Sequence, residues 1–238
     1  MLKFVGVGPG DPELITVKGM RALQEAEVVL YTGNLVPKEL LTWCKEGTLI
    51  ESSVEMSDED FYGFIKEHSY KKFVRLHPGD SSLFSTIAKQ VKFLRAEGIN
   101  FEVIPGVTAA FGAAASVGVE YTIPGVSQTL IISRVEGKTL NQEALKNLLS
   151  NKNSSFVFYL SIRLIAKLKV TAYKLGYSNT TPCWVVERAT WADEKIYKGT
   201  IEDIQEKVSH IKGVALIMFG EYLLQKAIIE SHLHAKQY

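Results

Sequence analysis

Two apolar runs in this sequence each end at a Pro-Gly pair. Residues 74–77 lead into the pair at 78–79, and residues 103–104 lead into the pair at 105–106. An apolar run that stops at Pro-Gly is typical of a buried strand followed by a tight turn, and residues that can cap a helix follow each pair. Both stretches therefore predict strand, turn and helix. In open α/β folds such turns lie at the carboxyl ends of the strands, where ligands bind.

Asp80 directly follows the first Pro-Gly pair and has two interpretations. Its carboxylate could cap a helix expected to begin near Ser82, since Asp is a preferred capping residue. Alternatively, it contacts a ligand at the edge of the sheet. The residue alone leaves both interpretations open.

The chain begins with an apolar run, residues 2–7, that enters a glycine-rich turn at residues 6–12. A dinucleotide site would need backbone donors in this turn and an acidic residue at the end of the next strand. Pro9 and Pro12 have no N–H, and the expected second strand, residues 28–31, leads into Thr-Gly-Asn. We therefore exclude NAD and expect this backbone to pack closely against a ligand edge or a second loop.

Composition limits the class of protein. The chain has 238 residues, 46% of them hydrophobic, and a formal net charge of +1. This length suffices for one large domain or two small ones. Without a clustered basic excess we expect no nucleic-acid partner. No apolar run approaches the length of about 20 residues that spans a bilayer, so we expect no membrane association.

The cysteines and histidines indicate no metal site. Cys44 and Cys183 lie far apart in the sequence, which favours a reduced, cytoplasmic setting over a disulfide framework. His232 and His234 form a His-X-His pair near the end of the chain, but no third ligand is nearby. Such a pair is more typical of a terminal tail than of a metal centre.

The order of the expected elements predicts two α/β domains, residues 1–122 and 123–238. In the first, strands and helices alternate strictly, which indicates a parallel sheet. This alternation ends near residues 121–125. In the second, the expected strands 183–188 and 195–198 are joined by a connection too short for a helix, so they are expected to be antiparallel and the sheet mixed.

The chain resembles the tetrapyrrole (corrin/porphyrin) methyltransferase family along almost its whole length. Five motifs carry the resemblance, in the family's order and at family-like spacing: residues 5–19, Gly79-Asp80, residues 104–109, residues 133–139 and residues 189–195. The resemblance implies two α/β domains with a cleft between them, S-adenosylmethionine as co-substrate and a homodimer. One position departs from the family, because Ser81 stands where a proline usually follows Gly-Asp, which makes the turn less rigid.

The resemblance also implies cofactor contacts. Matched position by position, these are Pro9, Gly79, Asp80, Leu83, Thr108, Ala109, Leu160, Ala189 and Ala215. S-adenosylmethionine has no phosphate, so backbone donors, apolar walls and one carboxylate suit it, and Pro-Gly-Asp turns supply them. The acceptor would be a tetrapyrrole. Within the family, the chain most resembles the members that methylate corrin precursors.

Methyl transfer to a ring carbon needs no protein nucleophile, so alignment and exclusion of water should dominate, with a base assisting proton loss. The candidate bases are His77 and Glu136, although a turn histidine and an ordinary Glu-Gly turn are simpler interpretations. Arg134, Lys138 and Arg188 are candidates for holding the acceptor's carboxylates, or they are surface charges paired with nearby acids. The alternatives are another tetrapyrrole acceptor such as uroporphyrinogen III, or a non-catalytic nucleotide-binding module.

Overall fold

The computed structural model of the protein describes residues 1–137 and 141–225. It divides into two compact units. The first consists of Met1–Gly112 together with Thr190–Ala192, and the second of Ala113–Ala189 and the chain from Asp193 onward.

The boundary between the units differs from the expected one at residues 122 and 123. It falls between Gly112 and Ala113, inside helix α4 (Ala109–Val117). The chain after α4 is already bonded to the second unit, because Ser155 donates a hydrogen bond to the Tyr121 carbonyl over 2.6 Å. The strict alternation of strands and helices ends near residue 121, but the compact unit ends earlier, at Gly112.

The first unit contains a five-stranded sheet in the order β3-β2-β4-β1-β5. All neighbouring strands are parallel, as the alternation predicted. The strands are β1 (Leu2–Gly6), β2 (Val28–Tyr31), β3 (Leu49–Ser52), β4 (Phe73–His77) and β5 (Phe101–Ile104). The two strands that end at Pro-Gly, β4 and β5, are the two neighbours of β1.

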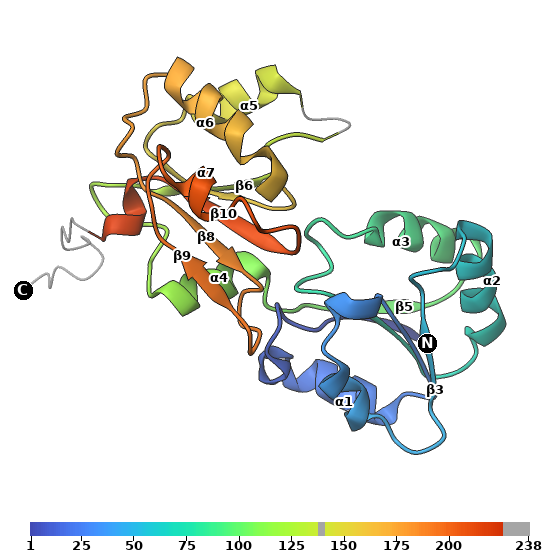
Figure 1. Cartoon of the computed structure of the whole chain (residues 1–238). Coiled ribbons are helices and arrows are strands. Elements are labelled where there is room, and N and C mark those ends of the chain that lie inside the picture. The colour runs from blue at the N-terminus through green and yellow to red at the C-terminus, as the bar shows by residue number, and fades with distance from the viewer. Residues whose placement is uncertain (138–140, 226–238) are drawn as a thin grey trace, which may run out of the picture. The chain divides into compact units, whose positions relative to one another are not determined.

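Helices cover both faces of this sheet (Figure 1). Helix α1 (Val17–Glu25) packs on one face, with Val5 and Val74 in the same apolar cluster. Helices α2 (Asp58–His68) and α3 (Ile87–Ala96) pack on the other, where Phe4 is buried. Short 3-10 helices occupy the connections Pro12–Leu14, Gly33–Leu35 and Lys38–Trp43.

Helix α3 begins later than the sequence suggested. It was expected to begin near Ser82 and starts at Ile87. Side chains in the preceding segment bond to local backbone instead: Asp80 accepts from the Ser82 N–H, and Ser85 Oγ accepts from the Ile87 N–H over 3.2 Å. Phe84 has a positive φ of 51°, which a helix does not allow. Serine and aspartate often compete with helical hydrogen bonding in this way.

The second unit contains a mixed five-stranded sheet in the order β6-β7-β10-β8-β9. Its strands are β6 (Thr129–Ser133), β7 (Ser154–Phe158), β8 (Cys183–Glu187), β9 (Lys195–Tyr197) and β10 (Ala215–Phe219). Strands β6 and β7 are parallel, and the other pairs are antiparallel. The expected antiparallel pairing of β8 with β9 is confirmed.

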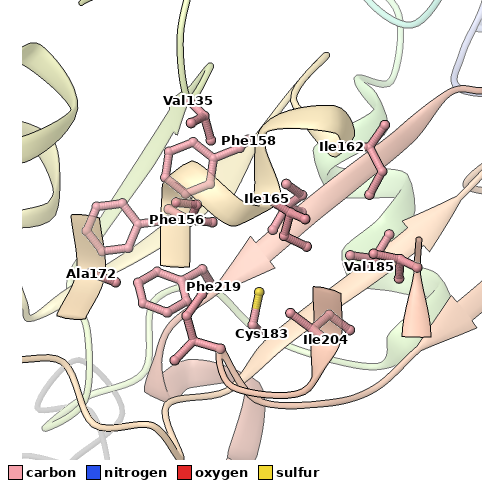
Figure 2. Close-up of a cluster of buried hydrophobic side chains, with 14 of the residues drawn as sticks. Val135, Phe156, Phe158, Ile162, Ile165, Ala172, Cys183, Val185, Ile204 and Phe219 are labelled. Atoms are coloured by element: carbon pink, nitrogen blue, oxygen red, sulfur yellow. The ribbon is translucent and has the colours of Figure 1, made fainter. Parts of the chain in front are cut away.

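One apolar cluster forms the core of the second unit. Phe156, Phe158 and Phe219 from the sheet are fully buried against helices that cover one of its faces (Figure 2). These helices are α5 (Gln142–Leu149), α6 (Ile165–Lys174) and α7 (Ile204–Lys207), with 3-10 segments at Ile162–Leu164 and Glu221–Leu224. No helix within residues 1–137 and 141–225 is long and apolar enough to cross a membrane.

Candidate functional site

Three turns meet backbone to backbone at the carboxyl edge of the first sheet. They follow the adjacent strands β4, β1 and β5. A Cβ on Gly6 would lie 2.6 Å from the Gly106 nitrogen and 2.8 Å from the Gly79 carbonyl oxygen, both closer than real Cβ atoms approach. Only glycine permits this approach. Within the first unit, the glycine-rich start therefore packs against other loops, which was one of the two expected partners.

Gly8 and Gly79 connect the turns after β1 and β4 by hydrogen bonds. The Gly79 N–H donates to the Gly8 carbonyl over 2.8 Å, and the Gly8 N–H donates to the Gly79 carbonyl over 3.2 Å. Both residues have positive φ, 85° for Gly8 and 63° for Gly79, which glycine adopts without strain. This reciprocal pair of hydrogen bonds holds the two turns side by side.

Asp80 joins the second turn to the third. Its Oδ2 accepts a hydrogen bond from the Gly106 N–H over 2.8 Å, and its Oδ1 accepts from the Ser82 N–H over 2.8 Å and from the Ser82 hydroxyl. Burial alone raises the pKa of Asp80, but these hydrogen bonds outweigh it and hold the pKa below its ordinary value. Asp80 is therefore more than a local cap, because it also connects two turns that come from different strands.

A segment distant in the sequence completes the first turn. The indole Nε1 of Trp191 donates to the Pro9 carbonyl over 2.9 Å, and the Asp11 N–H donates to the Thr190 hydroxyl over 3.0 Å. A Cβ on Gly10 would overlap the Trp191 indole ring. Residues Thr190–Ala192 consequently belong to the first unit although their flanking residues belong to the second.

The backbone is unusual at the start of this segment. Arg188 and Thr190 have positive φ values of 52° and 67°. Leu160, in the turn after β7, has a φ of 53° and is 62% exposed. Positive φ is rare for residues other than glycine and least favourable for a β-branched residue such as threonine. Such strained positions cluster at functional sites, and Leu160 is an expected cofactor contact.

His77 is buried at the end of β4. Only 3% of it is exposed, and its ring packs on Phe4 with the ring centroids 5.7 Å apart. Burial, and secondarily the charge of Arg75, lower its pKa to about 3. A neutral, inaccessible imidazole with so little proton affinity is a poor general base at neutral pH. These observations favour a structural role for His77 over the catalytic one suggested by the sequence.

The remaining expected contacts of the first unit lie on two of the three turns. Thr108 is buried and its carbonyl accepts hydrogen bonds from the Phe111 and Gly112 N–H groups, so it begins helix α4. Ala109 is the first residue of that helix. Leu83 follows the Asp80 turn and its N–H donates to the Asp80 carbonyl over 3.3 Å. Thr108 and Leu83 thus flank the backbone contacts made by Gly6, Gly79 and Gly106.

In the second unit, the expected contacts also lie at strand ends. Ala215 begins β10 and pairs with Glu187, the last residue of β8, and the Arg188 N–H donates to the Val214 carbonyl over 3.0 Å. Ala189 and Ala215 are both buried. The Arg188 Nε donates to Asp193 over 2.6 Å, so this arginine is paired with an acid, which was the alternative to substrate binding.

Glu136 and Arg134 follow β6, and Lys138 lies outside the described residues. Glu136 forms an ion pair with Lys167 of α6 over 2.7 Å and is partly exposed. Val135 lies between Arg134 and Glu136. Its N–H donates to the buried Ser161 hydroxyl over 2.8 Å, and this bond joins the turns after β6 and β7. The histidine pair at 232 and 234 also lies outside the described residues, and within the described residues no cluster of metal-ligating side chains occurs.

Sequence reasoning missed two features of this region. One is the contact of Trp191 with Pro9 and Gly10, for which the only sequence signal was a tryptophan inside a motif rich in small and polar residues. The other is Arg75, a charged residue in the middle of an otherwise apolar buried strand. Its position in that strand was itself a signal, because charged residues are almost never fully buried unless paired.

The fold and these turns define a two-unit α/β protein with three closely packed glycine turns at the carboxyl edge of its parallel sheet. Residues 1–205 match the family of Tetrapyrrole (Corrin/Porphyrin) Methylases. The chain belongs to this family, and it shares the methyltransferase fold of the family's enzymes.

Curated relatives align along nearly the whole chain. A cobalt-precorrin-4 C(11)-methyltransferase of Methanocaldococcus jannaschii is 43% identical, with 99% of this chain and 93% of the relative covered. The enzyme of the same name from Priestia megaterium is 37% identical, covering 100% and 92%. A precorrin-4 C(11)-methyltransferase of Pseudomonas aeruginosa is 36% identical, covering 99% and 95%.

Solved structures agree with the fold. A cobalt precorrin-4 methyltransferase of cobalamin biosynthesis superposes with a TM-score of 0.89 at 38% identity, covering 93% of this chain and 95% of that one. A uroporphyrin-III C-methyl transferase of Thermus thermophilus, complexed with S-adenosylhomocysteine, superposes with a TM-score of 0.78 at 28% identity, covering 94% and 98%. The expected pair of α/β domains, parallel and then mixed, is thereby confirmed.

Proposed function

We propose that this protein transfers a methyl group from S-adenosylmethionine to C11 of a corrin precursor, precorrin-4 or its cobalt complex, in cobalamin biosynthesis. The observation that carries the proposal is the 43% identity, over 99% of the chain, with a cobalt-precorrin-4 C(11)-methyltransferase. The glycine turns of the first unit support it, because they provide the backbone-lined edge that such a donor requires.

The donor fits the chemistry of the turns. S-adenosylmethionine carries a sulfonium cation and no phosphate, and the first turn lacks the N–H donors of a phosphate cradle because Pro9 and Pro12 have none. The carboxylate of Asp80 gives the edge a negative charge. The proposed donor contacts are the ones that the family resemblance implies: Pro9, Gly79, Asp80, Leu83, Thr108, Ala109, Leu160, Ala189 and Ala215.

The reaction is an in-line displacement. The ring carbon of the acceptor forms a bond to the methyl carbon, the carbon–sulfur bond breaks with its electrons moving to sulfur, and S-adenosylhomocysteine leaves. The protein's contribution is to align the two reactants and exclude water. The rigid Gly6–Gly79–Gly106 contact suits this role, because a preformed site loses little freedom when the donor binds.

Of the two candidate bases, Glu136 remains in the proposal. It is partly exposed, and its ion pair with Lys167 fixes the position of its carboxylate. Arg134, Lys138 and Arg188 are proposed to hold acetate or propionate groups of the macrocycle. Of the two that the structure describes, Arg188 is adjacent in sequence to Ala189, an expected donor contact. We also propose that the protein acts in the cytoplasm as a homodimer.

A second acceptor is the main alternative. The Thermus thermophilus relative is a uroporphyrin-III C-methyl transferase, so the same fold serves another tetrapyrrole. The relatives at 33% to 43% identity that act on precorrin-4 favour the corrin precursor.

Calorimetry tests the donor. We expect S-adenosylhomocysteine to bind and NAD not to bind. Binding of NAD without binding of S-adenosylhomocysteine would contradict the proposal.

A variant tests the acceptor site. Arg188→Ala should raise the KM for the tetrapyrrole and leave S-adenosylhomocysteine affinity unchanged, and the rise in KM should be smaller at high salt.

A further inference from the structure

Arg75 is a buried cation in the middle of strand β4. Only 4% of it is exposed. Its neighbours Val74 and Leu76 face the cluster beneath α1, so Arg75 points to the opposite face, where α2 and α3 pack. Burial lowers its pKa to about 10, which leaves the guanidinium charged at neutral pH.

This charge has no counter-ion in the described part of the chain. Arg75 Nη2 donates to the Thr32 hydroxyl over 3.0 Å, while Nε and Nη1 are buried without an acceptor. The Phe61 ring lies under the guanidinium, 5.2 Å from its centre, and compensates only in part. The carboxylate of Asp80, which follows the same strand, accepts hydrogen bonds from Gly106 and Ser82.

Such an arrangement is costly for folding alone. A buried charge is normally paired, and buried donors normally have acceptors. The second basic group on the same face, His77, also has a buried ring nitrogen, Nε2, without a partner. His77 carries no negative charge that could offset the positive charge of Arg75. The first unit therefore keeps a cation whose natural partner is an anion from outside the chain.

The guanidinium also lies near the edge where ligands are expected. Arg75 pairs with Leu30 across β2 and β4, and its hydrogen bond runs to Thr32, two residues nearer the carboxyl end. Thr32 directly follows β2 and is half-buried. A planar, forked guanidinium beside a hydroxyl is suited to hold a carboxylate through two parallel hydrogen bonds.

We propose that Arg75 and Thr32 form a buried carboxylate-binding subsite at the carboxyl edge of the first sheet. This inference rests on the proposed function, which supplies two sources of a carboxylate. One is an acetate or propionate group of the tetrapyrrole acceptor, and the other is the amino-acid carboxylate of the methyl donor. Either would place a negative charge on the unpartnered Nε and Nη1.

The test compares Arg75→Met, Arg75→Lys and a control, Arg95→Met, in the full chain. Arg95 is an exposed arginine of α3 whose guanidinium lies 5.9 Å from the Phe101 ring, so its removal tests loss of a cation over an aromatic ring. The measurements are the KM for precorrin-4 and the dissociation constants of S-adenosylhomocysteine and of methylthioadenosine, which has no carboxylate.

We expect Arg75→Met to weaken binding of one carboxylate-bearing ligand about ten-fold or more. A higher KM for the acceptor with unchanged S-adenosylhomocysteine affinity assigns the carboxylate to the acceptor. Weaker S-adenosylhomocysteine with unchanged methylthioadenosine assigns it to the donor. Arg75→Lys should lose less, because it keeps the charge without the fork, and Arg95→Met should match wild type.

The melting temperature gives an independent readout. Removing an unpaired buried charge should raise it by about 2–4 °C in Arg75→Met. Unchanged binding in a variant that folds, or equal weakening of methylthioadenosine, would contradict the subsite. A lower melting temperature with unchanged binding would identify Arg75 as structural. Failure of the wild type itself to bind donor or acceptor would instead remove the proposed function, and the subsite with it.

Discussion

The indole of Trp191 donates a hydrogen bond to the carbonyl of Pro9 over 2.9 Å, joining residues separated by 182 positions. Beside it, the hydroxyl of Thr190 accepts from the Asp11 N–H. These two bonds use the Pro9 carbonyl and the Asp11 N–H of the first turn, in which Pro9 and Pro12 contribute no N–H. A segment embedded in the second half of the sequence thereby sets the conformation of the glycine-rich turn.

Trp191→Phe should weaken S-adenosylhomocysteine binding about two- to ten-fold, because it keeps a ring over Gly10 and removes one hydrogen bond of about 0.5–1.5 kcal/mol. Calorimetry measures the effect. Trp184→Phe is the matched control, since Trp184 lies in β8 beneath Lys198 and makes no contact with this turn within the described contacts. Equal affinity in wild type and Trp191→Phe would show that the turn needs no such anchor.

Gly106→Ala should destabilise the first unit strongly, by about 3 kcal/mol or more, because its Cβ would enter the Gly6 backbone. The Gly6 carbonyl carbon would lie 2.6 Å from it. Gly63→Ala is the control: it lies inside α2 with nothing within 4 Å of the added atom. It should stabilise by about 0.5–1 kcal/mol. Urea denaturation measures both, and similar effects of the two changes would refute the close backbone contact.

Asp80→Asn should lower the free energy of unfolding at pH 7 by about 1.5–3 kcal/mol, since the anionic acceptor is lost. The folded pKa of Asp80 lies below its ordinary 3.8, so its carboxylate stabilises the fold above that pH. The difference between wild type and variant should shrink as the pH falls through the folded pKa. Denaturation at pH 7 and pH 3 tests this.

Cofactor binding separates the two interpretations of Asp80. A contact to the donor predicts a loss of S-adenosylhomocysteine affinity of about ten-fold or more on Asp80→Ala. A purely structural connection between the turns predicts reduced stability with affinity retained.

His77 should make stability depend on pH between about 3 and 6.5, the folded and ordinary pKa values. In this window the unfolded chain binds the proton and the folded chain does not, so stability rises with pH and is complete above 6.5. Relative to His77→Gln, the wild type should lose up to about 1.4 kcal/mol per pH unit on acidification. The pH dependence of kcat should keep its shape in the variant, and loss of an inflection would restore His77 as a base.

The turns could be predicted because their signals are local. Pro-Gly after an apolar run, as at residues 78–79 and 105–106, specifies a strand end whatever surrounds it. The predicted start of α3 was wrong because side chains such as Ser85 compete with the hydrogen bonds of a helix. Trp191 on Gly10 could not be predicted, since contacts between distant segments leave no periodic pattern in one sequence.

The most direct test of the account is turnover with an isotopically labelled methyl donor. The protein should convert precorrin-4, with or without cobalt, to a product whose labelled methyl group NMR locates at C11, and it should release S-adenosylhomocysteine in equal amount. Uroporphyrinogen III should react far more slowly. A label at another ring position, or faster turnover of uroporphyrinogen III, would contradict the proposed acceptor. Absence of S-adenosylhomocysteine with every tetrapyrrole would contradict methyl transfer itself.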